Sequence, residues 1–143
     1  MQTIKTIYLV SCVSRKQDGC HQAKELYTSD WFVKARAFVE KTNESWYILS
    51  AEYGLLSPSK EIANYNKTLN LMPVNERRRW ASQVLNDLKS IIKPGDKVIF
   101  FAGQRYREFL IDSLIAMGVI VEIPMLGLQI GKQLQWMKER LSL

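Results

Sequence analysis

Residues 7–16 read IYLVSCVSRK, a short apolar run rich in β-branched residues that breaks off into small polar and basic side chains. In a parallel α/β sheet the ligand crevice lies outside the carboxyl ends of the strands. The polar residues after this run therefore predict a binding site directly behind the first strand. These residues are Ser11, Cys12, Arg15 and Lys16.

The length and composition are those of one globular domain covering residues 1–143. A chain of this size buries about two thirds of its unfolded surface, which is enough for one core. Hydrophobic residues make up 47% and charged residues 24%, a balance that excludes a disordered chain. No apolar stretch is long enough to cross a bilayer and the first residues lack a signal-peptide pattern. We therefore expect a soluble cytoplasmic protein without a membrane partner.

The charge balance points to a phosphate-bearing partner. Twenty Lys and Arg residues against fourteen Asp and Glu residues give a net charge of +6, and basic surfaces bind polyanions with release of counterions. A solvated basic surface is the alternative. Cys12 and Cys20, with His21 nearby, are too few ligands for a zinc site, so no metal or other cofactor is expected.

Apolar runs and helical patterns alternate along the chain, which predicts an α/β fold. The expected strands cover residues 7–10, 46–50, 97–101 and 119–123, and the expected helices cover 23–27, 30–41, 73–92, 103–117 and the C-terminal segment after 131. This order predicts a three-layer domain with an about four-stranded, mainly parallel sheet and helices on both faces. Residues 57–73 lack a clear period and are expected to form a long functional loop.

The strand ends bring further candidate residues to the same edge. Residues 50–56 (SAEYGLL) follow the second strand, and Gly54 allows a tight turn there. The substrate-binding candidates are Ser11, Cys12, Ser50, Tyr53, Gly54, Tyr65, Gly103, Gln104 and Tyr106; the catalytic candidates are Glu52, Asn66 and Lys16; the phosphate-binding candidates are Arg15, Arg77, Arg78 and Arg105. This set is rich in neutral hydrogen-bonding and aromatic groups, which suits a planar polar ligand.

Each of these residues also has a structural interpretation. A cysteine at a strand end, such as Cys12, is more often a small buried hydrophobe than a nucleophile, and Tyr53 and Tyr65 are equally compatible with packing anchors. The basic run 77–79 is compatible with a solvated helix face. Lys16 is compatible with a solvated side chain, a phosphate ligand or an amine nucleophile.

Several motifs together resemble an uncharacterised family of small bacterial and phage proteins. They are Ser11-Cys12 with Lys16, Leu26-Tyr27 with Phe32, SAEYGLL at 50–56, Ile62 with YNKTLN at 65–70, Trp80, Gly103 with Tyr106, and IGKQLQWM at 130–137. That family is similar to peroxide-stress DNA-binding proteins and to the catalytic-type domain of archaeosine synthase. Both groups are associated with a uracil-DNA-glycosylase-like fold. This chain has Asn66 where relatives tend to have Asp.

The resemblance implies chemistry on a base in nucleic acid, with DNA expected rather than RNA. Our leading hypothesis is an N-glycosylase that flips a modified base into the crevice, a function that would fit phage defence. Tyr53 and Tyr65 would stack on the base, while Asn66 and Gln104 would read its edge.

In this hypothesis Arg105 and Lys16 would hold phosphates, and Glu52 would stabilise the cationic sugar. One alternative is a base-modifying transferase similar to archaeosine synthase, with Lys16 or Cys12 doing covalent work. The other alternative is a non-enzymatic DNA-binding stress protein.

Overall fold

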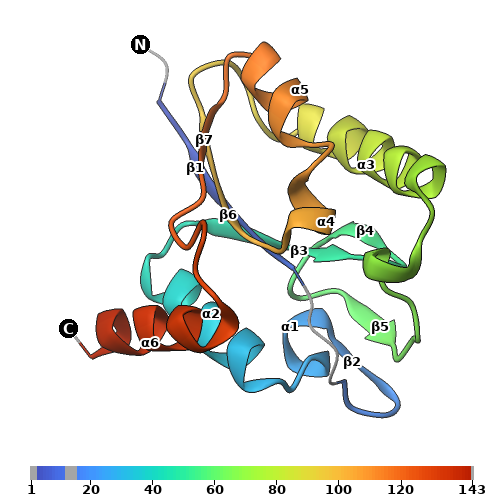
Figure 1. The fold of residues 1–143 in the computed structure, drawn as a ribbon, viewed down its shortest axis with the longest axis vertical. Helices are drawn as coiled ribbons and strands as arrows, with labels where there is room; N and C mark the ends of the chain where they lie inside the picture. The colour runs from blue at the N-terminus through green and yellow to red at the C-terminus, as the bar shows by residue number, and fades with distance from the viewer. Residues whose placement is uncertain (1–2, 12–15, 143) are drawn as a thin grey trace.

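A five-stranded sheet forms the centre of the molecule (Figure 1). The computed structural model describes residues 3–11 and 16–142. The strands of this sheet are β1 (Thr6–Ser11), β3 (Ser45–Ser50), β4 (Gly54–Leu56), β6 (Lys97–Phe101) and β7 (Ile120–Glu122). Their order is β4-β3-β1-β6-β7, with every pairing parallel except that of β3 with β4. The four predicted parallel strands are therefore confirmed.

The central strand β1 is the point at which the chain changes direction across the sheet. From β1 the chain moves to β3 on one side and then crosses to β6 on the other. In open α/β sheets such a reversal leaves a crevice outside the carboxyl ends of the strands. Ser11 ends β1 at that point, as the sequence predicts.

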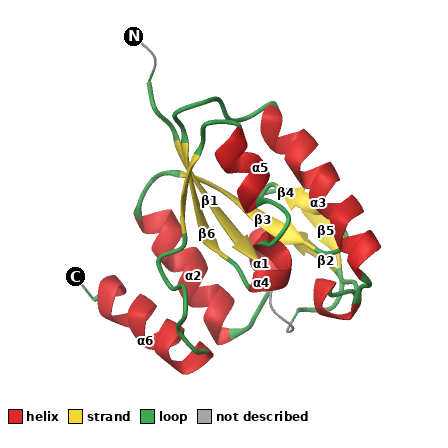
Figure 2. Ribbon diagram, turned by 45° about the horizontal axis from the view of Figure 1, so that its top comes forward, coloured by secondary structure: helices red, strands yellow, loops and turns green. Residues whose placement is uncertain are grey.

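Helices cover both faces of the sheet (Figure 2). On one face lie α1 (Ala23–Leu26), α2 (Asp30–Lys41) and α6 (Ile130–Leu141), and on the other lie α3 (Val74–Lys89), α4 (Gln104–Arg107) and α5 (Ile111–Ala116). Successive strand residues point to opposite faces, so Leu9 packs with the α3 side and Val10 with the α2 side. Because both faces are covered, β1 and β6 read as continuous apolar runs.

The second helix shows how the local sequence determines an element. The Ser29 side chain accepts a hydrogen bond from the Phe32 amide at 3.2 Å and caps the helix. Phe32, Ala35 and Val39 recur at helical spacing, and all three are fully buried against the sheet.

Three details differ from the sequence-based expectation. The sheet has a fifth strand, β4, which is a three-residue antiparallel edge strand that follows a turn at Gly54 with φ +70°. The expected loop 57–73 contains β5 (Glu61–Ala63), which pairs with β2 (Cys20–Gln22), and a 3₁₀ turn, η1 (Leu69–Leu71). Local periodicity does not reveal these elements, because β5 depends on a partner distant in sequence and β4 and η1 are only three residues long.

The third difference is that the helix expected over residues 103–117 is divided into α4 and α5. The amides of Tyr106 and Leu110 donate to carbonyls three residues back, at Gly103 and Arg107. These shorter bonds tighten the chain and interrupt the α-helix.

The amino end of the sheet is organised by a buried carboxylate. Asp96 is 0% exposed, and its two oxygens accept hydrogen bonds from the amides of Lys5 and Lys93, each at 3.0 Å. Burial alone would raise the pKa of Asp96, but these amide bonds and the charges of both lysines outweigh it and lower the pKa. The carboxylate thereby ties the start of β6 to the segment preceding β1.

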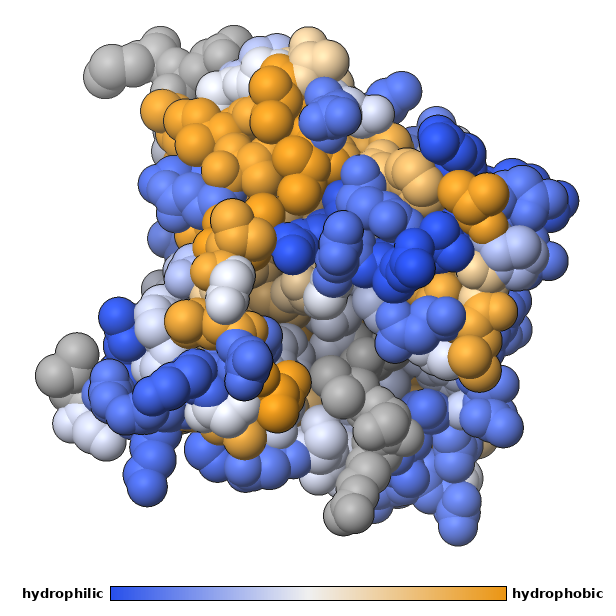
Figure 3. Space-filling view, in the orientation of Figure 1, coloured by the Kyte–Doolittle hydropathy of each residue, from blue (hydrophilic) through white to orange (hydrophobic). Residues whose placement is uncertain are grey.

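The broadest apolar area on the face seen in Figure 3 lies over α5 and β7. Ile115 is 57% exposed and Ile120 is 49% exposed there. Among residues 3–11 and 16–142, no helix has the length and apolar character needed to span a membrane.

Candidate functional site

A cleft of about 810 Å³ opens at the carboxyl ends of β1 and β6. Ser11 at the end of β1 and Ala102 and Gly103 directly after β6 form part of its wall. The cleft therefore lies at the reversal of strand order, where α/β sheets bind ligands. Its volume is within the range of small-molecule sites.

Amides, hydroxyls, amines and aromatic rings line the cleft. Its lining residues are Ser11, Lys16, Trp31, Asn66, Lys67, Thr68, Asn70, Leu71, Met72, Glu76, Ala102, Gly103, Tyr106, Ile130 and Gln133. Five predicted site residues are thus brought together, namely Ser11, Lys16, Asn66, Gly103 and Tyr106. This chemistry suits a planar ligand whose edge carries hydrogen-bond donors and acceptors.

Lys16 is held against an aromatic ring. Its Nζ lies 4.8 Å from the centre of the Tyr65 ring, and its backbone pairs with Tyr27 in an isolated antiparallel bridge. The ring face attracts the ammonium group through its quadrupole. A base stacking on this face of Tyr65 would have to displace Lys16, so the predicted stacking role of Tyr65 requires movement of the lysine.

Hydrogen bonds between hydroxyl groups hold the Tyr65 side chain in place. Ser50 Oγ accepts from the Tyr53 amide and donates to the Tyr65 hydroxyl, both at 3.0 Å. The Tyr65 and Tyr27 hydroxyls are 2.6 Å apart, and either can be the donor. Ser50 is 0% exposed. In this geometry Ser50 positions Tyr65 and does not line the cleft.

Aromatic packing fixes Tyr106 in the same way. Its ring meets Trp80 edge to face at 5.8 Å, and the Trp80 indole nitrogen donates to the Ser50 carbonyl at 2.8 Å. Tyr53 packs edge to face on Tyr65 at 5.6 Å. The aromatic candidates therefore form a rigid support for the cleft.

Two carboxylates lie near the cleft. The predicted catalytic Glu52 is outside its lining and pairs with Lys67, Oε2 to Nζ, at 3.8 Å. Glu76, in the first turn of α3, lines the cleft and has no ion pair with any described residue. Glu76 is therefore the carboxylate best placed to reach a ligand, and the sequence analysis missed it.

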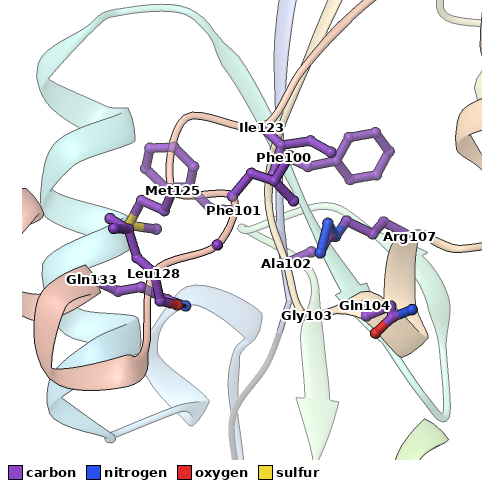
Figure 4. Close-up of a pocket in the computed structure, with 12 residues that line it drawn as sticks. Phe100, Phe101, Ala102, Gly103, Gln104, Arg107, Ile123, Met125, Leu128 and Gln133 are labelled. Atoms are coloured by element: carbon purple, nitrogen blue, oxygen red, sulfur yellow. Dashed lines mark hydrogen bonds between the residues drawn. The ribbon is translucent and has the colours of Figure 1, made fainter.

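A smaller pocket of about 140 Å³ adjoins the cleft (Figure 4). Ala102, Gly103 and Gln133 line both cavities. The predicted Gln104 lines the smaller pocket, together with Arg107 from the same short helix. The two cavities thus share part of their walls and lie side by side at the end of β6.

The predicted phosphate-binding arginines have protein partners. Arg77 Nε donates to Glu108 at 2.8 Å, and the Arg78 guanidinium lies 4.4 Å from the centre of the Phe109 ring. Arg105 approaches the same Glu108 at 3.8 Å and is half exposed. Their binding to phosphate stays a prediction, and for Arg77 it would compete with an internal ion pair.

Two predicted site residues, Cys12 and Arg15, lie outside the described residues. Within the described ranges, no three His, Cys, Asp or Glu side chains come together to hold a metal ion.

Trp31 and Gln133 belong to the site although neither follows a strand. The Trp31 indole nitrogen donates to Gln133 Oε1 at 2.8 Å, and Gln133 Nε2 donates to the Leu128 carbonyl at 2.8 Å. These bonds join α2, α6 and the preceding loop across more than a hundred residues of sequence. No local pattern signals such a pairing.

The comparison with protein families gave one match, to a family model described as a family of unknown function (DUF6884), over residues 7–139. The chain belongs to this family. The matched range includes the described residues of the candidate site, from Ser11 to Gln133. The comparisons with curated proteins and with solved structures gave no match.

Proposed function

We propose that this protein is an enzyme that acts on a base in nucleic acid, most specifically a DNA N-glycosylase that removes a modified base. The observation that carries the proposal is the 810 Å³ cleft at the reversal of strand order, lined by amides, hydroxyls, lysines and rings. A base swung out of a duplex needs a pocket that contacts its faces and hydrogen-bonds its edge. The resemblance to proteins of nucleic-acid chemistry and the net charge of +6 support the same ligand class.

The polar groups of the cleft supply recognition in this proposal. Asn66 and Asn70 offer amide groups that can donate and accept at a base edge, and Lys16 and Lys67 offer positive charge to the strand. Leu71 lies at the cleft with 86% of its surface exposed. An exposed apolar side chain at this position suits contact with the faces of neighbouring bases.

Glu76 supplies the anion for the chemistry. When the bond between C1′ and the base breaks, the electron pair leaves with the base and the sugar becomes cationic. A carboxylate beside the sugar stabilises that cation and takes a proton from the water that adds to C1′. Glu52 is the alternative carboxylate and would act from its ion pair with Lys67.

Transfer chemistry on the base is the second candidate, and the position of Lys16 favours it. Lys16 lines the cleft, and its amine lies over the Tyr65 ring with no ion pair to any described residue. An amine held in this way can act as a nucleophile when it is deprotonated. A transferase would leave an altered base in the strand, whereas a glycosylase leaves an abasic site.

The test is to incubate the protein with unmodified DNA and with phage DNA that carries hypermodified bases. Abasic sites are counted, and free bases and digested nucleosides are weighed by mass spectrometry. We expect abasic sites and free base from the modified DNA alone. Mass-shifted nucleosides without abasic sites would establish the transferase. Salt-sensitive binding to both DNAs without any product would overturn both enzymes and leave a binding protein.

Carboxylate variants make this test specific to the cleft. Glu76→Gln should slow base release by about a hundredfold or more, the usual contribution of an acid or base catalyst, while DNA affinity changes little. Glu139→Gln is the matched control, because Glu139 is exposed on α6 and outside the cleft. If Glu76→Gln releases base at the wild-type rate and Glu52→Gln does not, the catalytic carboxylate is Glu52.

A further inference from the structure

The small pocket beside the cleft is lined by an arginine whose buried Nε has no acceptor among the described residues. Arg107 reaches from α4 toward Ala102 and lines this pocket (Figure 4). Its Nε is buried and has no hydrogen-bond partner among the described residues. A buried donor without a partner costs free energy, and more so when it is charged.

The neighbouring carboxylate is already occupied. Glu108 accepts from Arg77 at 2.8 Å and lies 3.8 Å from Arg105, so two arginines share one acid. No ion pair within the described residues includes Arg107, and no Asp or Glu lines its pocket. The positive charge at the pocket is therefore not neutralised by the described protein.

The walls of the pocket strengthen any interaction with this charge. Phe100, Phe101, Ile123, Met125 and Leu128 contribute apolar side chains to the lining of the pocket. Charges attract more strongly next to such low-dielectric walls than in water. A neutral ligand would leave the charge of Arg107 uncompensated, whereas an oxyanion would compensate it and accept from Nε.

The other polar side chains of the pocket define where the anion lies. Gln133 uses both ends of its amide on Trp31 and Leu128, so it acts as a fixed wall between pocket and cleft. The Gln104 amide also lines the pocket and has no hydrogen bond to another described residue. Arg107 and Gln104 are thus two donor-bearing residues on one short helix, and the pocket that they line shares Gly103 with the cleft.

We propose that Arg107 and the small pocket form an anion subsite that binds a phosphate of the nucleotide whose base occupies the cleft. Arg is suited to this because its planar fork donates two parallel bonds to one phosphate. That the anion is a nucleotide phosphate rests on the proposed function. The existence of an anion site rests on Arg107 and its pocket alone.

The test compares probes that differ in phosphate. Binding of inorganic phosphate, deoxycytidine, deoxycytidine monophosphate and a short single-stranded oligonucleotide is measured by calorimetry. Wild-type protein should bind the monophosphate at least tenfold more tightly than the nucleoside. If the oligonucleotide gains the same factor without a terminal phosphate, the subsite takes an internal diester. If the oligonucleotide binds tenfold more tightly than the nucleoside only when it carries a terminal phosphate, the subsite binds the phosphate at a strand end.

Arg107→Met removes the guanidinium while keeping an apolar side chain in the pocket. The tenfold preference for the monophosphate should disappear, while affinity for deoxycytidine stays within about twofold. Arg107→Lys keeps the charge but loses the fork, and it should retain a reduced preference. Arg79→Met is the control, because Arg79 is exposed on α3 and lines neither cavity. An unchanged preference in a folded Arg107→Met or Arg107→Lys variant would overturn the subsite.

The two proposals fail separately. If wild-type protein binds inorganic phosphate through Arg107 but binds neither nucleoside nor oligonucleotide, the anion subsite stands and the proposed function falls. If base release occurs and Arg107→Met neither weakens phosphate binding nor changes discrimination, the proposed function stands and the subsite falls.

Discussion

The charged groups at the two ends of the parallel strands differ in whether their hydrogen bonds are satisfied. At the amino end, the Asp96 carboxylate is fully buried and both of its oxygens accept backbone hydrogen bonds. At the carboxyl end, Arg107 Nε is buried without a described partner and the Lys16 amine rests on an aromatic ring. A saturated buried charge stabilises a fold, whereas an unsaturated one is available to a ligand. The amino end of the sheet therefore suits a stabilising role, and the carboxyl end suits binding of a ligand.

The largest effect should come from removing the saturated charge. Asp96→Ala leaves the amides of Lys5 and Lys93 without their acceptors, and hydrogen bonds to a charged group are the stronger kind. We expect a loss of about 2–4 kcal/mol in the free energy of unfolding. Urea denaturation measures it. A loss below about 1 kcal/mol, the worth of one ordinary hydrogen bond, would remove the structural role of Asp96.

The next largest effect should be the loss of folding stability at acidic pH. Because the folded pKa of Asp96 is lowered, its contribution is complete above the unfolded value of about 3.9 and is lost as the pH falls through the folded value. Wild-type stability should therefore fall below about pH 4, with a slope of up to about 1.4 kcal/mol per pH unit from this one group. Asp96→Asn should have a shallower slope in the same range. Equal slopes would contradict the assignment.

Arg77→Met tests whether a saturated charge near the binding end also serves stability. The Arg77 and Glu108 side chains are 11% and 19% exposed and their ion pair is 2.8 Å long. We expect a loss of about 1–2 kcal/mol in stability, less than for Asp96 because Glu108 retains Arg105. The salt dependence of DNA binding should stay unchanged. A reduced salt slope would return Arg77 to the phosphate-binding residues.

Lys16→Met should have the smallest effect on stability and a clear effect on binding. The contact of Lys16 with Tyr65 is worth about 0.5–1 kcal/mol at a partly exposed site. Affinity for a single-stranded oligonucleotide should fall about fivefold or more, and its salt slope should decrease by about one unit. Lys60→Met, an exposed lysine outside the cleft, should leave both unchanged. Equal affinity in the two variants would contradict a binding role for Lys16.

The strands were predictable because their physics is local. Residues 97–101 (KVIFF) can be buried on both faces of a sheet, and the predicted bounds of β6 are those of the structure. Lys16 and Gly103 could be expected in the cleft for the same reason, since each follows a strand that ends at the same edge. Position along a strand is sufficient for such residues.

The remaining site residues depend on information that sequence position does not contain. Glu76 and Arg107 lie on helices, and their places in the site depend on how α3 and α4 pack on the sheet. The Trp31 side chain lines the cleft and is held there by a hydrogen bond to Gln133, more than a hundred positions away. Ser50 is the opposite case: it ends a strand, but its side chain is fully buried against Tyr65 and does not line the cleft.

The most direct test of the comparison is a titration of isotope-labelled protein with a short single-stranded oligonucleotide, followed by amide resonances in NMR spectra. We expect the resonances of the Lys16, Asn66, Gly103 and Tyr106 amides to shift, while those of the Lys5 and Lys93 amides around Asp96 stay in place. Shifts confined to the amino end or to the exposed face of α3, or no shifts at all, would contradict the assignment of binding to the carboxyl end of the sheet.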